Sequence, residues 1–361
     1  MTLRLNVPRI FLLFALLIVA AVDGPAQATR QNIATACAGC HASQARPQPD
    51  TPMGRGMQWP DLNPLFKTHP QMSFRKGAYT YTVETKGGQT TYSVTDGTRT
   101  ISLPIHWSFG KGAQTWVLEK DGQLLESMVS YYPSIDGLEV TTGDEPLKPQ
   151  NLDEAVGRKL RTSEPKDCFG CHSTGSVANG KLHLETLEPG VRCQHCHAGA
   201  ESHMVAALQG DAYGTAPPDL RKLTSEDMSN FCGQCHRTWE TVVRSHWRGE
   251  VDVRFQPYRL ANSKCFDGTD PRASCIACHD PHQDLVREDS YYDPKCLACH
   301  ASKNELEGSA QTASQRDAKA CPVASDKCAS CHMPQVKLPN GLVTFHDHEI
   351  RIAKPGMPYP D

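Results

Sequence analysis

The sequence has few apolar residues, no strong charge of either sign and none of the common signatures of hydrolases. Hydrophobic residues make up 39% of the 361 residues and aromatic residues 7%, and the mean hydropathy is −0.48. The net charge is −3 without a basic run, which argues against nucleic acid as a partner. No Ser/His/Asp constellation, phosphate-binding loop or paired-carboxylate motif is present. Nothing therefore predicts hydrolysis or nucleotide binding.

The longest apolar run lies at the N-terminus. Arg4 and Arg9 precede an apolar stretch over residues 10–22, and Ala26-Gln27-Ala28 follows it. Thirteen residues are too few to span a bilayer, so the pattern is typical of a secretory signal peptide cleaved near Ala28, with a retained anchor as the alternative. We expect a periplasmic or extracellular protein with no membrane span after cleavage.

Cysteine is unusually frequent and unusually ordered. Of the 16 cysteines, 14 fall into seven Cys-x-x-Cys-His units. The units are Cys37/Cys40/His41, Cys168/Cys171/His172, Cys193/Cys196/His197, Cys232/Cys235/His236, Cys275/Cys278/His279, Cys296/Cys299/His300 and Cys328/Cys331/His332. Cysteines three residues apart share one face of a helical turn, so both can form thioethers to one porphyrin, and the next histidine can bind its iron. Zinc half-sites and thioredoxin-like pairs need no such histidine. The pattern predicts seven covalent haem c groups.

The haem motifs and the β-forming segments occupy different parts of the chain. Six motifs lie between residues 168 and 332, where the protein alone has little apolar material to bury, so we expect the chain without haem not to fold. Segments with period-two alternation and no cysteine precede them, separated by turns at Gly87-Gly88, Asp96-Gly97 and Asp121-Gly122. These segments are residues 79–83, 91–94, 98–103, 115–118 and 124–132.

This distribution predicts a mixed fold. We expect a mainly α-helical and irregular multihaem domain with an inserted antiparallel β meander of five or six strands. The expected units are a signal peptide (1–28), the first haem motif with a Pro-rich loop (29–70), the β segment (71–145) and a six-haem domain (146–361). Asn151 is expected to cap a helix running to about Leu160, and Thr224 one that leads into Cys232.

Several segments resemble multihaem cytochromes of the cytochrome c-554 type, a group loosely related to hydroxylamine oxidoreductase and pentahaem nitrite reductase. They are Cys168-Phe-Gly-Cys-His172-Ser-Thr-Gly, Pro189-Gly-Val-Arg-Cys193-Gln-His-Cys-His197, Cys275-Ile-Ala-Cys-His279-Asp-Pro-His282, Tyr292-Asp-Pro-Lys-Cys296-Leu-Ala-Cys-His300, Cys328-Ala-Ser-Cys-His332-Met-Pro, Phe345-His-Asp-His348-Glu-Ile350, Leu103-Pro-Ile and Val129-Ser-Tyr-Tyr132. Similar proteins often read Cys-His-Gly-Pro-Gly-x-x-His where this chain has Cys196-His-Ala-Gly-Ala-Glu-Ser-His203. The resemblance implies electron transfer by closely packed haems.

Nine histidines outside the motifs are candidates for the sixth iron ligand. His203 and His282 follow motif histidines by six and three residues, and His348 matches the family ending. His69 is a further candidate, in competition with Met53 at the first haem. The remaining five are weaker candidates whose alternative is a hydrogen-bonded or solvated side chain, namely His106, His183, His195, His246 and His346.

Cys265 and Cys321 are the two cysteines outside the motifs. Both fall where similar proteins have cysteines, and the expected compartment is oxidising, so the resemblance predicts a disulfide between them. Two free thiols, or a non-haem ligand, are the alternatives.

Two functions of different classes fit the sequence. The first is an electron carrier, with redox proteins as partners and with self-association or a larger haem complex as a third possibility. The second is an oxidoreductase with one open five-coordinate haem that acts on a small nitrogen or sulfur compound. No Cys-x-x-Cys-Lys unit of the kind common in pentahaem nitrite reductases occurs, which favours the carrier.

Overall fold

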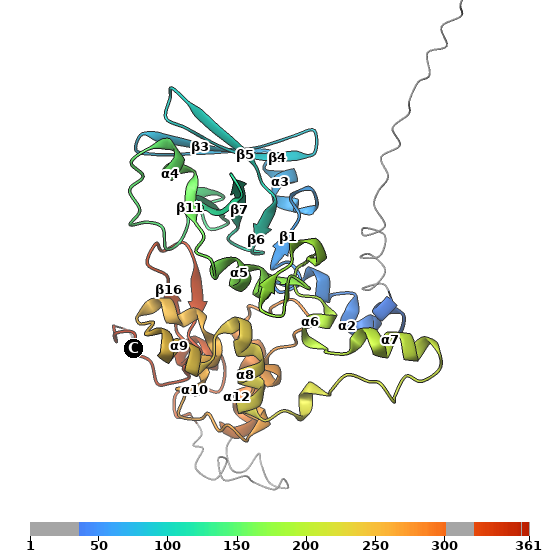
Figure 1. Ribbon diagram of the computed structural model, residues 1–361. Coiled ribbons are helices and arrows are strands. Elements are labelled where there is room, and N and C mark those ends of the chain that lie inside the picture. Colours follow the sequence, from blue (N-terminus) through green and yellow to red (C-terminus); the bar gives the residue numbers. More distant parts are fainter. Residues whose placement is uncertain (1–35, 301–320, 355, 361) are drawn as a thin grey trace, which may run out of the picture.

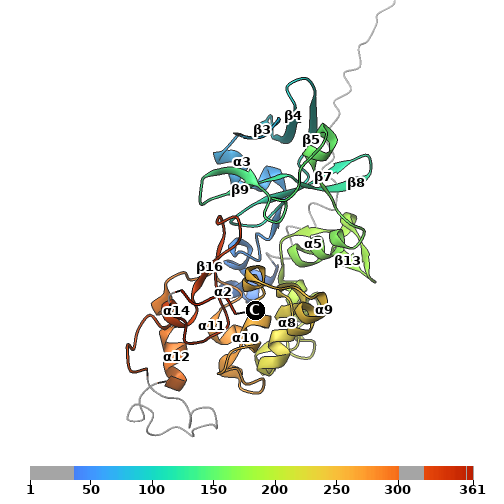
Figure 2. The ribbon, with the colours of Figure 1, turned by 90° about the vertical axis from the view of Figure 1, so that its left-hand side faces the viewer.

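The computed structural model describes residues 36–300, 321–354 and 356–360. Its larger β-sheets gather at one end of the molecule, and the helices that carry most haem motifs gather at the other (Figure 1). The view turned by 90° shows the same separation (Figure 2). Within the described ranges, no helix combines the length and the apolar character needed to cross a membrane.

Two antiparallel sheets and a hairpin form the β region. One sheet has the order β1-β6-β7-β8-β11, the other has the order β2-β3-β4-β5, and β9 pairs with β10. The strands are β1 (Met57–Gln58), β2 (Gln71–Lys76), β3 (Tyr79–Lys86), β4 (Gln89–Thr95), β5 (Thr100–Pro104), β6 (Trp107–Phe109), β7 (Thr115–Lys120), β8 (Gln123–Ser127), β9 (Val129–Tyr132), β10 (Gly137–Val140) and β11 (Gly157–Lys159). The mixed fold with an antiparallel β segment is thereby confirmed.

The main apolar core lies in this region. The alternating side chains of β3 and β4 place Tyr81, Val83 and Tyr92 against Trp116 of β7, all at most 1% exposed. The turns form where the sequence predicts them, because Gly87, Gly97 and Gly122 adopt the positive φ values that tight hairpins require.

Two details of the β region differ from the sequence prediction. Residues 124–132 form two strands instead of one, since the chain leaves the first sheet at Met128 and β9 pairs with β10. The helix capped by Asn151, α4 (Leu152–Val156), ends before Leu160 because Gly157 enters β11 and pairs with Ser127 of β8.

The haem-motif region consists of short helices joined by long loops. They are α2 (Ala42–Ala45), α3 (Pro64–Thr68), α5 (Glu164–His172), α6 (Cys193–Cys196), α7 (Ala200–Leu208), α8 (Ser225–His236), α9 (Trp239–Ser245), α10 (Gln256–Ala261), α11 (Cys275–Cys278), α12 (Asp293–His300) and α14 (Cys328–His332), with α3 lying in the β region. Short hairpins pair β12 (Ser173–Thr174) with β15 (Glu188–Pro189), β13 (Val177–Ala178) with β14 (Lys181–Leu182), and β16 (Gln335–Lys337) with β17 (Thr344–His346). Single 3-10 turns are η1 (Gln48–Asp50), η2 (Pro60–Leu62), η3 (Leu184–Thr186), η4 (Leu220–Lys222), η5 (Glu250–Arg254), η6 (Pro271–Ala273) and η7 (Asp289–Tyr292).

The two regions meet at α5. Phe169, within the motif Cys168-Phe-Gly-Cys171, is fully buried and packs edge-to-face on Trp107 and Phe109, with ring centroids 5.2 Å apart in each pair. The second haem motif is thus fixed to the β region by aromatic packing. Deeper in the haem region, a small core cluster consists of Val242, Phe255 and Tyr258, far fewer residues than the core between the sheets contains.

Candidate haem-binding site

Each Cys-x-x-Cys-His motif lies on a short helical segment. Residues 36–40 are helical, and the other six motifs lie at the ends of α5, α8 and α12 or make up α6, α11 and α14. Thr224 caps α8 as predicted, with its hydroxyl accepting from the Asp227 amide at 3.1 Å. All 14 motif cysteines are unbonded, so each is available for a thioether.

One large cavity joins the motifs. Its volume is about 3220 Å³. Cysteines and histidines of the first six motifs line it, with the exception of Cys168, and Ala329 and Met333 extend the wall to the seventh. The space is partly open to solvent and borders the motif side chains, so it can hold bulky groups attached at these cysteines.

The seventh motif differs from the first six, because none of Cys328, Cys331 and His332 lines this cavity. Cys331 is exposed and does not line the cavity, and its Sγ lies 3.8 Å from the hydroxyl of Ser330. The reason is the start of α14, where the Asp293 carboxylate of α12 accepts from the Cys328 amide at 2.8 Å. This contact holds Cys328 against α12 and the Cys296 thiol and leaves the last turn of α14, with Cys331, facing solvent.

The Cys331 thiol, like those of Cys168 and Cys328, does not line the shared cavity. The structure does not put this thiol on the wall of the shared cavity, so a thioether at Cys331 stays a prediction for a solvent-exposed position. Cys40 is exposed as well, but it does line the cavity. The spacing of a Cys-x-x-Cys-His motif thus predicts that its cysteines share a helical turn. It does not predict whether that turn faces the cavity or the solvent.

Three distal candidates each lie beside a motif histidine. The ring centroids are 6.3 Å apart for His41 and His203, and 6.1 Å apart for His197 and His282. For His279 and His348 the distance is 6.2 Å. With metal–imidazole bonds of about 2.0 Å on both sides, two histidines on one iron have ring centroids about 6 Å apart. The three pairs therefore have the spacing at which one haem iron fits between the rings.

Hydrogen bonds at Nδ1 prepare several of these histidines as ligands. Nδ1 of His172 donates to the Gly56 carbonyl at 3.0 Å, Nδ1 of His332 to the Arg351 carbonyl at 2.9 Å, and Nδ1 of His348 to the His346 carbonyl at 3.0 Å. A carbonyl only accepts, so the proton must be on Nδ1, and Nε2 keeps its lone pair for a metal.

Burial favours the same neutral form. It lowers the pKa of His172, His236 and His279, and it lowers the pKa of His348 to about 4. A neutral imidazole can bind iron without first losing a proton. His236 is also oriented by a 3.2 Å contact between its Nδ1 and Oε1 of Gln256.

One comparison with known proteins matches part of the chain to a haem-binding family. Residues 141–198, which contain the second and third motifs, match the model of the family described as cytochrome c554 and c-prime. This segment is therefore similar to c-type cytochromes of that family. No curated protein matches the chain. A solved structure, the outer cell wall cytochrome OcwA, aligns with 82% of this chain at 16% identity and a TM-score of 0.37. The chain covers 61% of the length of that cytochrome.

The haem motifs contact one another around α8. A hydrogen bond between the Cys171 and Cys235 thiols lowers the pKa of Cys171 to about 7 and raises the pKa of Cys235. A second one, between Cys232 and Cys275, raises the pKa of Cys232 and lowers that of Cys275. The motif on α8 therefore lies directly between the motifs on α5 and α11, and α8 packs against both of these helices.

Further contacts extend this arrangement in both directions. Burial and the adjacent Cys193 thiol raise the pKa of Cys37, and burial and the Cys296 thiol raise that of Cys278. Helices α12 and α14 pack together, which joins the last two motifs. The charge of the nearby Cys196 thiol group also raises the pKa of Cys235, which places these two motifs side by side. The motifs thus form one connected series, in which each motif neighbours the next. Named by their histidines, the order is His41, His197, His236, His279, His300 and His332. The motif of His172 lies beside the motif of His236, as a branch of this series.

His69 lies away from this series. Its Nδ1 contacts the Thr68 hydroxyl at 2.9 Å, its Nε2 contacts Asp136 at 2.9 Å, and its ring lies against Tyr131. Both ring nitrogens are thus engaged in the β region, so the structure does not support His69 as an iron ligand. Met53 lines the cavity, but the ring beside His41 is that of His203.

The weaker histidine candidates divide into two groups. His195 and His346 line the cavity. His106 packs on Trp107, His183 pairs with Glu185 at 2.9 Å, and His246 ends α9 in a left-handed conformation. The hydrogen-bonded or solvated role fits these last three.

The structure contradicts the disulfide between Cys265 and Cys321. Both cysteines are unbonded and exposed. Cys265 lies on the cavity wall, whereas Cys321 directly follows residues 301–320, which lie outside the described part of the chain. The places of Cys265 and Cys321 in the sequence therefore did not predict whether the two thiols are bonded.

The sequence gives no signal for most of the residues that orient the motif histidines. Gly56, Gln256 and Arg351 contact motif histidines but lie 19 or more residues from them in sequence. The histidine-Asp-histidine pattern at residues 346–348 was a usable signal, since an acid between two candidate ligands calls for a cationic partner.

Proposed function

We propose that the mature protein is an exported heptahaem cytochrome that transfers electrons along a series of closely packed haems. The observation that carries the proposal is the placement of His203, His282 and His348 at 6.1–6.3 Å from three motif histidines. A histidine at this distance closes the open side of an iron. Closed irons suit electron transfer, because reduction requires little change in their ligands.

Haem iron, when bound, supplies one-electron exchange between its ferric and ferrous states. The chain supplies ligands, spacing and insulation. The contacts among Cys171, Cys235, Cys232 and Cys275 bring neighbouring attachment sites together, which shortens each electron step. Different burial and hydrogen bonding of the motif histidines would give the sites different potentials.

The β region supports this function without taking part in it. Phe169 anchors the second motif to β6 through Trp107 and Phe109. We propose that this region covers one side of the haem series, and that redox proteins, or further copies in a larger haem complex, exchange electrons at the other side. Residues 1–28, the proposed signal peptide, lie outside the described residues.

Two measurements on the purified protein test the proposal. Intact-protein mass spectrometry should give the mass of a chain beginning near Thr29 with seven haems. A spectroelectrochemical titration should show overlapping low-spin transitions, without turnover of nitrite, hydroxylamine or tetrathionate. Fewer haems in fully matured protein contradict the count. Steady turnover that is lost when one haem site is disabled contradicts the carrier and supports the oxidoreductase.

A further inference from the structure

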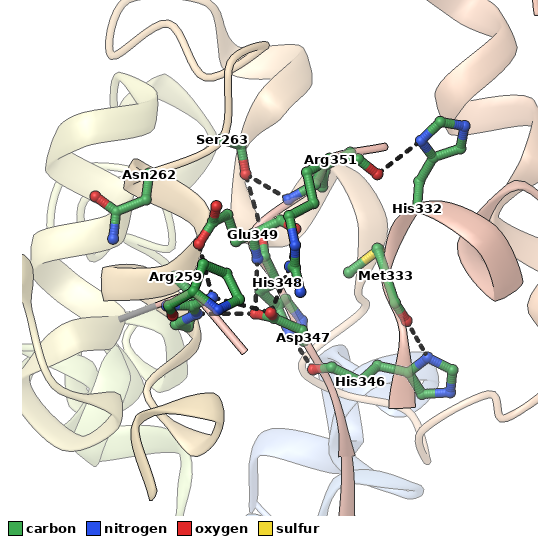
Figure 3. Close-up of polar contacts among 12 residues, drawn as sticks. Arg259, Asn262, Ser263, His332, Met333, His346, Asp347, His348, Glu349 and Arg351 are labelled. Carbon is green, nitrogen blue, oxygen red and sulfur yellow. Dashed lines mark hydrogen bonds and ion pairs between the residues drawn. The ribbon is translucent and has the colours of Figure 1, made fainter. Parts of the chain in front are cut away.

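Two histidines near the C-terminus flank a fully buried acid. His346 and His348 both line the haem cavity, while Asp347 between them is 0% exposed and points away from it toward α10 (Figure 3). Successive residues of an extended segment point to opposite sides. A shift of one residue would therefore bring Asp347 into the cavity and remove both histidines from it.

Arg259 of α10 holds Asp347 on the far side. Its Nε and Nη2 donate to the two carboxylate oxygens at 2.8 and 2.9 Å, and Nη2 also contacts Glu349 at 2.6 Å. Arg259 is itself 1% exposed, and Arg351 makes a third ion pair, with Asp347, at 2.5 Å. A two-pronged guanidinium–carboxylate contact fixes direction as well as distance.

Backbone contacts fix the same segment on its other side. The Ser263 hydroxyl donates to the His348 carbonyl at 3.1 Å and accepts from the Ile350 amide at 2.8 Å. The Asp347 amide donates to the Pro334 carbonyl at 3.0 Å. The His348 ring is then oriented by its own Nδ1 contact with the His346 carbonyl. These contacts thus fix the backbone around His348.

A buried ion pair adds little net stability, because desolvating the charges offsets most of their attraction. It does, however, allow only one register of residues 346–350. Apolar contacts alone would tolerate the one-residue slip, whereas a slipped segment would leave Arg259 unpaired in a buried position.

We infer that Arg259 is a positioning residue for an iron ligand: it fixes the register of residues 346–350 so that His348 binds the iron of the haem attached at His279. The inference rests on the proposed function for the assignment of His348 as a ligand. It adds a residue that lies outside the haem motifs and pairs with Asp347 and Glu349, which also lie outside them.

The test uses the full haem-loaded protein and four variants. His348→Gly removes the ligand itself. Arg259→Lys keeps the charge and removes the two-pronged contact. Ser263→Ala removes only the hydroxyl that fixes the His348 backbone, and it carries the test if Arg259→Lys does not assemble. Arg158→Lys is the matched control, because Arg158 also bridges several carboxylates, namely Glu126, Asp144 and Glu164. The readout is the high-spin ferric signal in electron paramagnetic resonance, normalised to the haem count, with and without added imidazole.

We expect His348→Gly to gain one high-spin iron per chain, and imidazole to return it to low spin. Arg259→Lys, or Ser263→Ala in its place, should gain a fraction of the same signal, with the same response to imidazole and an unchanged haem count. Arg158→Lys should match the wild type. If His348→Gly gains the signal but neither Arg259→Lys nor Ser263→Ala does, the inference is overturned and the ligand assignment stands. If His348→Gly itself gains no high-spin iron, both fail.

Discussion

The planes of the His282 and His197 rings are nearly parallel, with an angle of 9° between them, and Nδ1 of His282 lies 3.1 Å from the Asp280 carboxylate. An acceptor at Nδ1 leaves Nε2 free for iron. His282→Ala should therefore convert one low-spin haem into a high-spin haem, which added imidazole restores. Optical and magnetic resonance spectra of the oxidised variant measure this.

The matched control for that variant is His183→Ala, since His183 is paired with Glu185 outside the cavity. Its spectrum should equal that of the wild type. An unchanged spectrum in His282→Ala would show that His282 is no ligand.

Asp144 gives the β region a pH dependence. Burial and the charge of Glu126 raise the pKa of Asp144 to about 6, despite the nearby Arg158. A raised pKa means that the folded state disfavours the ionised carboxylate. The stability that protonated Asp144 gives the folded state is therefore fully present below about pH 4 and is lost as the pH rises through 6. Asp144→Asn removes the cost and should stabilise the region by roughly 1–3 kcal/mol at pH 7.5.

Hydrogen-exchange mass spectrometry over residues 123–159 checks the effect by comparing variant and wild type at each pH. The difference should disappear near pH 4, where both side chains are neutral. A variant that is less protected at pH 7.5 would show that the Arg158 pair outweighs the desolvation of Asp144.

Candidate ligands could be named from the sequence, but the motif histidine that lies beside each candidate could not. His203 follows His197 by six residues, yet its ring lies beside His41, 162 positions earlier. Short offsets from a motif identify a histidine that can reach the cavity. Which motif it serves depends on how loops more than a hundred residues apart pack together.

Among the elements, β11 depends on one close backbone approach. A Cβ at Gly157 would lie 2.1 Å from the Glu126 carbonyl, which no side chain tolerates. Gly157→Ala should therefore separate β11 from β8 and destabilise the β region by about 1–3 kcal/mol. Chemical denaturation followed by circular dichroism measures the loss.

Gly112→Ala is the control for this change, because nothing lies within 4 Å of a Cβ there and its φ is not in the left-handed region. It should leave the unfolding midpoint within error of the wild type. Equal unfolding midpoints for both variants would mean that β11 and β8 can move apart without any loss of stability.

Local signals predicted elements well where turn chemistry fixed them. Gly87-Gly88 and Asp121-Gly122 form the predicted hairpins, with positive φ at all four residues. The break at Met128 and the end of α4 at Val156 were missed, because both are set by pairing with other strands. Propensity alone contains no information on such partners.

At the scale of the whole molecule, burial is unevenly divided between protein and cofactor. The β region has a continuous apolar core, whereas the haem region surrounds a cavity of about 3220 Å³. The sequence predicts that the whole chain fails to fold without haem, but the core between the sheets limits this expectation to the haem region. Without haem, we expect residues 57–160 to stay folded and the rest to unfold, since cofactor binding supplies the missing burial.

Limited proteolysis of chain produced without haem attachment, followed by mass spectrometry, shows the outcome. A resistant fragment confined to residues 57–160 agrees with the account. Protection of the haem region equal to that of the haem-loaded protein would show that its own side chains suffice.

The central claim is that histidines close the irons of a connected haem series. Electron paramagnetic resonance of the fully oxidised wild-type protein tests it most directly. Low-spin signals should account for at least three irons per chain, those between His41 and His203, His197 and His282, and His279 and His348. A spectrum in which high-spin iron exceeds the four remaining sites would contradict it.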